Sequence, residues 1–161
     1  MGRSFKVVAV GGTFDSLHKG HKTLLLKAFE VSEHVLIGLC SDEFAKTLKK
    51  SHPTASYAQR LGELRAFLNQ ADLLVRAEIV LLSDAYGPAL FSESIEALVV
   101  SKETESPAIV LNKKRKIAGL PLLKIVVVDL VPAKDGLPIS TTRIRRGEVD
   151  KEGSLLESCS K

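Results

Sequence analysis

Short apolar runs alternate along this chain with longer segments in which apolar residues recur at helical spacing. The apolar runs predict strands over 5–10, 34–40, 76–82, 97–101 and 124–130. The segments between and after them predict helices over 20–32, 42–50, 57–70, 88–96, 106–118 and 140–147. Runs such as VVAV and KIVVVDL are almost continuously apolar, which is typical of strands buried on both faces. We therefore predict an α/β fold in which a five-stranded parallel sheet carries helices on both faces.

Local capping signals support two of these helices. Ser41 stands before the helix predicted at 42–50, and Ser56 before the one at 57–70; serine is a preferred N-cap residue. The chain has 161 residues, 45% of them hydrophobic, which suits one domain with a sizeable core. We assign this domain to residues 1–150. Residues 151–161 are polar and rich in small side chains, and we expect them to form a flexible C-terminal tail.

Composition narrows the class of protein and of partner. No apolar run reaches the roughly 18 residues of a membrane-spanning helix, and the N-terminal segment lacks a signal-peptide cleavage site. We expect a soluble, cytoplasmic protein without a membrane partner. The net charge is +4, but 19 acidic residues are spread among 23 basic ones and aromatic residues are few; we expect a phosphate-rich small molecule rather than nucleic acid. Cys40 and Cys159 indicate neither a disulfide framework nor a metal site.

The segment GGTFDSLHKGH, residues 11–21, follows the first predicted strand directly. In open parallel sheets, ligands bind beyond the carboxyl ends of the strands, where a strand gives way to its helix. Gly11 and Gly12 allow a ligand to approach the main chain. Gly20 begins the next helix, whose first N–H groups attract an anion. The segment therefore predicts a phosphate-binding turn.

His18 and His21 admit three interpretations: metal ligands, packed or solvated residues without a function, or phosphate donors. Two ligands do not satisfy zinc, and no nearby cysteine or acidic cluster plainly supplies the others. A histidine at a helix N-terminus instead donates a hydrogen bond to a phosphoryl oxygen. Isolated histidines often have no such function, but the neighbouring glycines, Thr13 and Asp15 favour phosphate binding.

A second phosphate-binding pattern is ISTTRIR, residues 139–145. A helix start at Ser140 would present threonine hydroxyls and first-turn N–H groups to a phosphate chain. Arg143 and Arg145 add planar donors that suit phosphate. The alternative is an N-capped basic surface helix, which would be favoured if the first motif were absent.

Together the two segments resemble the motifs GTFDxxHxGH and ISTTxIR of the HxGH nucleotidyltransferase superfamily, whose members join a nucleotide monophosphate to a phosphate-bearing acceptor. The resemblance implies a Rossmann-like nucleotidyltransferase fold. The stretch VSKET, residues 100–104, with Asn112 and Arg115 after it, further resembles archaeal-type phosphopantetheine adenylyltransferases and the matching domain of eukaryotic coenzyme A synthase. The likeness runs from Val7 to about Asp150. It implies that ATP and 4'-phosphopantetheine give dephospho-coenzyme A and pyrophosphate, a step of coenzyme A biosynthesis.

The resemblance also implies roles for individual residues. His18, His21 and a lysine after the second strand would be catalytic. We choose Lys46 over Lys49 and Lys50 for this lysine, with a solvated basic helix face as the alternative. Thr13 and Lys46 would contact the acceptor. Contacts with ATP are expected from Gly12, Thr13, Phe14, His21, Asn112, Arg115, Ile139, Ser140, Thr141, Thr142 and Arg143. Mg²⁺ is expected with ATP because it offsets phosphate charge, and the sequence assigns it no protein ligand.

Other members of the superfamily are alternatives. SDEF and SYAQR resemble stretches of glycerol-phosphate cytidylyltransferases, but VSKET and the segment before ISTT do not fit those enzymes. An FMN adenylyltransferase is disfavoured for the same reason, and GTFD disfavours a nicotinamide-mononucleotide enzyme. A catalytically idle nucleotide-binding module has no support, because both histidines and ISTTR are intact. The sequence leaves the oligomeric state open.

Overall fold

The computed structural model describes residues 3–48 and 53–156. Its centre is one sheet of five strands in the order β3-β2-β1-β4-β5. The strands are β1 (Phe5–Gly12), β2 (Ser32–Cys40), β3 (Ala77–Leu82), β4 (Ala97–Ser101) and β5 (Lys124–Val128). Every neighbouring pair is parallel. The predicted five-stranded parallel sheet is confirmed.

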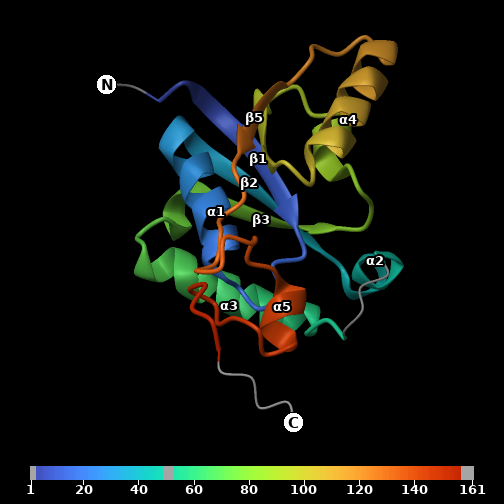
Figure 1. Ribbon diagram of the computed structural model, residues 1–161. Helices are drawn as coiled ribbons and strands as arrows, with labels where there is room; N and C mark the ends of the chain where they lie inside the picture. Colours follow the sequence, from blue (N-terminus) through green and yellow to red (C-terminus); the bar gives the residue numbers. More distant parts are fainter. Residues whose placement is uncertain (1–2, 49–52, 157–161) are drawn as a thin grey trace.

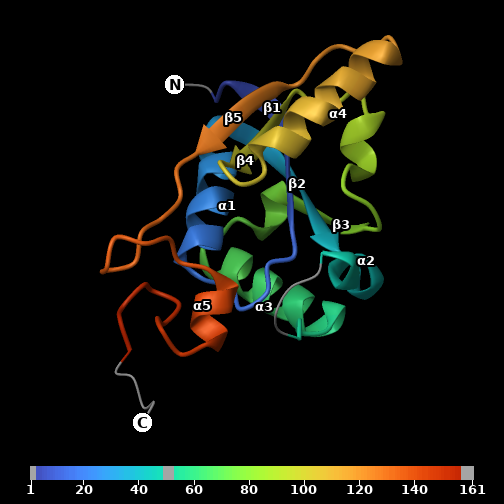
Figure 2. The same cartoon turned by 45° about the vertical axis from the view of Figure 1, so that its right-hand side comes forward.

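Helices cover both faces of this sheet (Figure 1). One layer consists of α1 (Lys19–Val31) and α3 (Tyr57–Gln70), and the other of α4 (Glu105–Ile117) with the 3-10 turn η2 (Gly87–Leu90). Figure 2 shows α4 and α1 on opposite sides of the strands. The side chains of β1 alternate between the layers: Val8 and Val10 pack with α1 and α3, whereas Ala9 packs with α4. Burial on both faces explains why residues 7–10 of this strand are all apolar.

Shorter elements follow the strands. They are α2 (Asp42–Thr47), η1 (Leu74–Arg76) and α5 (Thr141–Arg145). The Ser41 hydroxyl accepts from the N–H of Phe44 (3.0 Å) and the Ser56 hydroxyl from that of Gln59 (3.2 Å), so both predicted N-caps are confirmed. None of the helices in the described ranges is long and apolar enough to cross a membrane.

The helix predicted over 88–96 is wrong. The segment forms only η2, with Pro88 at its start, and then continues as turns and irregular chain to β4. The hydroxyl of Ser92 accepts from the backbone N–H of Ser94 (3.2 Å). Serine side chains that bind nearby backbone groups compete with helical hydrogen bonds, and Ser92, whose hydroxyl also lies 3.0 Å from that of Ser94, outweighs the apolar spacing of the segment.

Residues 151–156 of the expected tail make backbone hydrogen bonds with the rest of the domain. The carbonyl of Lys151 accepts from the N–H of Lys19 at the start of α1 (2.8 Å), and the carbonyl of Gly153 accepts from the N–H of Lys134 (2.9 Å). Residues 157–161, with Cys159, lie outside the described ranges. The domain boundary at 150 and the flexibility of the tail stay predictions.

β1 lies between β2 and β4, so the chain leaves the central strand toward one neighbour and later returns on the other side. At such a switch point the loops beyond the carboxyl ends diverge and leave a crevice. The segment with the two histidines begins there.

Candidate active site

The turn after β1 contains two strained residues. Phe14 and Ser16 have φ angles of 51° and 49°, in the left-handed region that residues other than glycine rarely adopt. Phe14 is only 2% exposed, and its ring meets the His21 ring edge-on, with 5.4 Å between centroids. Such strain persists only where the surroundings fix the backbone, and it is concentrated at functional turns.

His18 and His21 cap the start of α1 reciprocally. Nδ1 of His18 accepts from the backbone N–H groups of Gly20 (3.0 Å) and His21 (3.4 Å). Nδ1 of His21 accepts from the backbone N–H of His18 (3.2 Å). The two imidazoles thus form a capping box. Because both Nδ1 atoms are acceptors, this hydrogen-bond pattern assigns the proton of each neutral ring to Nε2, on the side away from the helix backbone.

Gly20 is required by the packing of the His18 ring. The rings of His18 and His21 stack with 3.7 Å between centroids and 20° between planes. A Cβ at position 20 would lie 2.8 Å from Cε1 and 3.0 Å from Nδ1 of His18. The HxGH spacing therefore stacks two rings over a residue that has no side chain.

The second predicted phosphate motif is bonded directly to the first. The Thr141 hydroxyl donates to the carbonyl of Asp15 (2.7 Å), 126 positions away. The Arg145 guanidinium donates to the Asp15 carboxylate, with Nη2 2.9 Å from both oxygens and Nε 3.1 Å from Oδ2. The Asp15 side chain has 0% exposure. These contacts join the histidine motif and ISTTRIR into one structural unit.

A groove lies where α1 and α5 begin. His18, Gly20, His21 and residues 139–142 form one part of its wall. The segments after β4 and β5 complete the wall with Ser101, Glu103 and residues 128–131. Imidazole N–H groups, hydroxyls and backbone N–H groups all serve as donors to phosphate. The structure thus brings both histidines together with Ile139, Ser140, Thr141 and Thr142.

Arg143, which the resemblance assigns to ATP, is engaged within the protein. Its Nε donates to Glu148 (3.1 Å), its two Nη atoms donate to the carboxylate of Asp135, and Nη1 also donates to the Pro138 carbonyl (3.1 Å). The hydrogen bond with Asp135 raises the pKa of Arg143. The same bond, with the backbone N–H of Leu137, holds the pKa of Asp135 below its ordinary value. Arg143 clasps the loop before α5, and its contact with ATP stays a prediction.

Asn112 and Arg115, also assigned to ATP, hold chain segments around α4. The Asn112 amide donates to the carbonyl of Leu123 (2.9 Å) and accepts from its N–H (2.8 Å). Arg115 is 1% exposed, and its guanidinium donates to three backbone carbonyls. Neither residue lines the groove. The structure gives both a structural role and does not bring them to the histidines.

The remaining predicted residues lie around the turn and on α2. Thr13 is 7% exposed, and its hydroxyl makes no hydrogen bond with another described residue. Gly12 ends β1 in the wall of a second cavity. Lys46 is exposed on α2 and lines neither cavity. Lys49 and Lys50 lie outside the described residues.

Three residues organise the site in ways that the sequence did not predict: Asp15, Arg145 and Arg60. Arg145 was expected to donate to phosphate, and its guanidinium instead donates to Asp15. Asp15 and Arg145 stand inside the two motifs, but nothing in the sequence pairs them. Arg60 is 0% exposed. It stands four and eight positions before the buried Leu64 and Leu68 of α3, so its place on an apolar helix face was the signal that marked it as buried.

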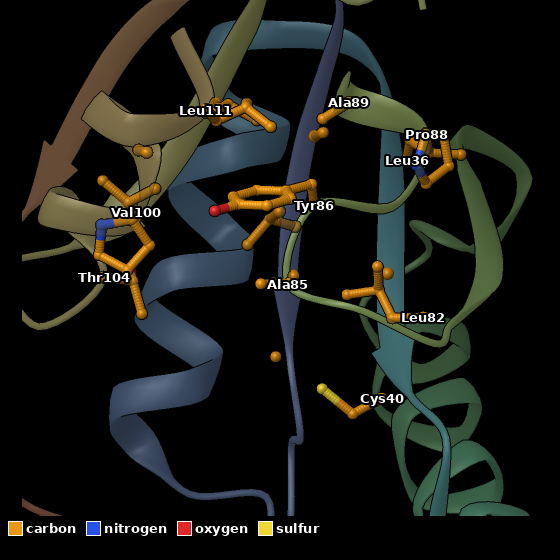
Figure 3. Close-up of a pocket in the computed structure, with 18 of the residues that line it drawn as sticks. Leu36, Cys40, Leu82, Ala85, Tyr86, Pro88, Ala89, Val100, Thr104 and Leu111 are labelled. Carbon is orange, nitrogen blue, oxygen red and sulfur yellow. The ribbon is translucent and has the colours of Figure 1, made fainter. Parts of the chain in front are cut away.

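The second cavity, of about 230 Å³, lies on the α4 side of the sheet. It is lined by the ends of β1, β2 and β4, by α4 and by the loop after β3, and none of its lining residues is charged. Tyr86 lies across it between Val100 and Leu82 (Figure 3). The Tyr86 hydroxyl has no hydrogen-bond partner in the described ranges. The cavity suits an apolar ligand with a polar group near this hydroxyl.

The parallel sheet, the strained turn after its central strand and the groove with two histidines define a nucleotidyltransferase of the cytidylyltransferase-like class. Residues 9–147 match the cytidylyltransferase-like family model.

Individual relatives narrow this class. The chain is 44% identical over 157 residues to the phosphopantetheine adenylyltransferase of Methanothermobacter thermautotrophicus, with 98% of this chain and 93% of the relative covered. It is 46% identical over 151 residues to that of Methanosarcina barkeri, with 92% and 91% covered. A crystal structure of a protein of unknown function from Archaeoglobus fulgidus matches with a TM-score of 0.68 and 35% identity, covering 77% of this chain and 98% of the other. The chain belongs to the phosphopantetheine adenylyltransferase family, and the resemblance inferred from its motifs is confirmed.

Proposed function

We propose that this protein transfers the adenylyl group of ATP to 4'-phosphopantetheine in the cytoplasm, giving dephospho-coenzyme A and pyrophosphate. The observation that carries the proposal is the groove in which His18 and His21 share a wall with Thr141 and Thr142. The names of the relatives supply the substrate pair.

The donor nucleotide would lie in the groove with its phosphates beside the two imidazoles. During transfer, an oxygen of the acceptor phosphate bonds to the α-phosphorus of ATP, and the bond from that phosphorus to pyrophosphate breaks. Negative charge grows on the phosphoryl oxygens and on the leaving group. The Nε2 donors of His18 and His21 are fixed by the capping box, so they stabilise this charge without reorganising.

The acceptor would place its phosphate near Thr13 and its pantetheine arm in the apolar cavity. Gly12 lies in the cavity wall and His18 in the groove wall, so the turn of residues 13–17 separates the two along the chain. The buried Thr13 hydroxyl would donate to the phosphate. The methyl groups of the arm match an uncharged lining, and the Tyr86 hydroxyl would bind one of its amides. Lys46 on α2 stays our choice for a second phosphate contact.

Mg²⁺ would accompany ATP, neutralising phosphate charge and keeping several of its waters. Glu103 and Asp129 lie in the groove wall, and they would hold those waters or bind the ion. Among the described residues, no three or more His, Cys, Asp or Glu side chains are grouped so that they could hold a metal ion, and a phosphate-bound Mg²⁺ does not need such a group.

The test is to incubate the purified protein with MgATP and 4'-phosphopantetheine and to follow pyrophosphate. We expect release that depends on both substrates. Parallel reactions contain CTP with glycerol phosphate, and ATP with FMN. No release from the first pair by folded protein would overturn the proposal, and release from CTP and glycerol phosphate would assign the cytidylyltransferase reaction instead.

A further inference from the structure

Arg60 lies at the point where β1 and β2 separate. The last paired residues of the two strands are Gly12 and Leu39. Just beyond them, Nη1 of Arg60 donates to the carbonyls of both Thr13 (2.9 Å) and Cys40 (2.8 Å). One nitrogen thus bridges the ends of the two strands, just beyond the point where the hydrogen bonds between the strands end.

The other donors of Arg60 bind the segments that flank these ends. Nε donates to the carbonyl of Ala55 (2.8 Å), whose N–H donates to Asp15 (3.2 Å). Nη2 donates to Asp42 (3.1 Å), the first residue of α2. Arg60 therefore joins the turn of the nucleotide motif to the helix that carries Lys46.

We propose that Arg60 is a positioning residue that sets the spacing between the turn of residues 13–17 and α2, and hence between the attacking phosphate and ATP. The inference rests on the proposed function, in which Thr13 and Lys46 contact the acceptor phosphate. A planar guanidinium reaches four acceptors at once, whereas a lysine ammonium is a point charge on a flexible stem. Arg60 contacts neither histidine nor α5 in any described hydrogen bond, so it does not directly hold the histidines and the start of α5 that line the groove.

Arg76 provides a matched control. Its guanidinium also donates to three backbone carbonyls, those of Phe29, Ser32 and Glu33. These carbonyls lie where α1 gives way to β2, at the amino end of that strand. Substitution of Arg76 removes a comparable set of hydrogen bonds at the opposite end of the strands.

The experiment compares Arg60→Lys and Arg60→Gln with Arg76→Lys and Arg76→Gln. Thermal unfolding, the Kd of a non-hydrolysable ATP analogue, kcat and the acceptor KM are measured, the kinetics at a temperature where each variant is folded. We expect kcat of Arg60→Gln to fall roughly 100-fold, the scale of a misplacement of about 1 Å, with a smaller loss for Arg60→Lys and a Kd of the analogue that changes far less than kcat. The Arg76 variants lose thermal stability but keep kcat.

Equal kcat in the Arg60 and Arg76 variants would overturn the inference, because Arg60 would then be only structural. If Arg60→Gln does not fold, Arg60→Lys against Arg76→Lys decides. Failure of the proposed function is seen separately, in wild-type protein that does not use 4'-phosphopantetheine. The kinetics are then measured with the acceptor that the wild type does use, and the same comparison decides.

Discussion

Asp15 and Arg145, 130 positions apart in the chain, form a bidentate ion pair that joins the two phosphate motifs. The Asp15 carboxylate is fully buried, while a third of the Arg145 side chain is exposed. The pair therefore fixes the start of α5 against the turn after β1. The Thr141 hydroxyl also donates to the carbonyl of Asp15. Asp15 therefore holds the start of α5, which forms one part of the groove wall, against the turn that leads to the two histidines.

Replacement of Arg145 by Gln removes the guanidinium that is paired with the buried Asp15 carboxylate. We expect the free energy of unfolding to fall by about 3 kcal/mol, at the lower end for a broken buried pair, and the Kd for ATP to rise. Denaturant unfolding and nucleotide titration measure the two effects. Arg146→Gln is the control, because that side chain is 63% exposed and lies 4.0 Å from its partner Glu148. A double-mutant cycle with Asp15→Asn that gives no coupling energy would contradict this role of the pair.

His18 combines a structural and a catalytic function, and two substitutions separate them. Asparagine is a good N-cap residue, so His18→Asn can keep the hydrogen bonds to the start of α1 while it removes the Nε2 donor. We expect near wild-type unfolding and a turnover about 100-fold lower, the scale for loss of one transition-state donor. His18→Ala should show the same loss of turnover and also lose about 1 kcal/mol of stability. Wild-type turnover in His18→Asn would exclude the catalytic role.

Where neighbouring residues decide the structure, the sequence predicted it well. The strand over 97–101 and the helix over 57–70 were predicted at the bounds that they have. The histidine motif was correctly placed at the end of β1, because it directly follows the apolar run of that strand and its glycines mark the turn. The helix predicted over 88–96 was wrong because the Ser92 hydroxyl binds the backbone N–H of Ser94, an interaction that the spacing of apolar residues does not reveal.

The site was less predictable where the role of a residue depends on the direction in which its side chain points. Arg115 stands among three lysines in the sequence, but α4 turns it inward and leaves Lys113, Lys114 and Lys116 exposed. Arg143 and Arg145 are two positions apart, so a helix directs them to different sides. One clasps Asp135 and the other binds Asp15. The sequence shows suitable charges, whereas their partners depend on contacts between distant segments.

The ion pair between Arg143 and Asp135 predicts that the thermal stability of the protein depends on pH. The folded-state pKa of Asp135 is depressed, so the contribution of the pair to stability is complete above the unfolded-state pKa of about 3.9. It is lost as the pH falls through the lower folded-state pKa. Asp135→Asn should therefore unfold at a lower temperature than wild type at neutral pH, and the difference should shrink below about pH 4. Melting curves between about pH 3 and 7 measure this difference.

Glu30→Gln is the control for this series, because Glu30 is exposed and pairs with Lys27 within α1 at 3.6 Å. Its effect on the melting temperature should be small throughout. A difference between wild type and Asp135→Asn that stays constant across the acid range would show that the carboxylate charge does not hold the loop.

The apolar cavity predicts a substitution that acts on the acceptor alone. Ala85 is exposed in the loop after β3 and lines the cavity (Figure 3), so Ala85→Phe fills it without disturbing the core. We expect the KM for 4'-phosphopantetheine to rise about tenfold or more, equivalent to about 1.4 kcal/mol of lost binding, with an unchanged Kd for ATP. Ala66→Phe, at an exposed position of α3 on the other side of the sheet, is the control. An unchanged KM in Ala85→Phe would place the pantetheine arm elsewhere.

Gly20 tests whether the stacked histidines need their present geometry. A methyl group at this position would press on the His18 ring, which is held by its hydrogen bonds to the helix start. Alanine favours a helix over glycine by up to about 1 kcal/mol, so Gly20→Ala should unfold no more easily than wild type while its turnover falls about 10- to 100-fold. Gly62→Ala in α3, where an added Cβ meets nothing within 4 Å, should gain stability and keep wild-type turnover. Stopped assays of pyrophosphate release and thermal melts of both variants decide the matter. If Gly20→Ala turns over as fast as Gly62→Ala, the close approach of the His18 ring to position 20 is not what makes glycine necessary there.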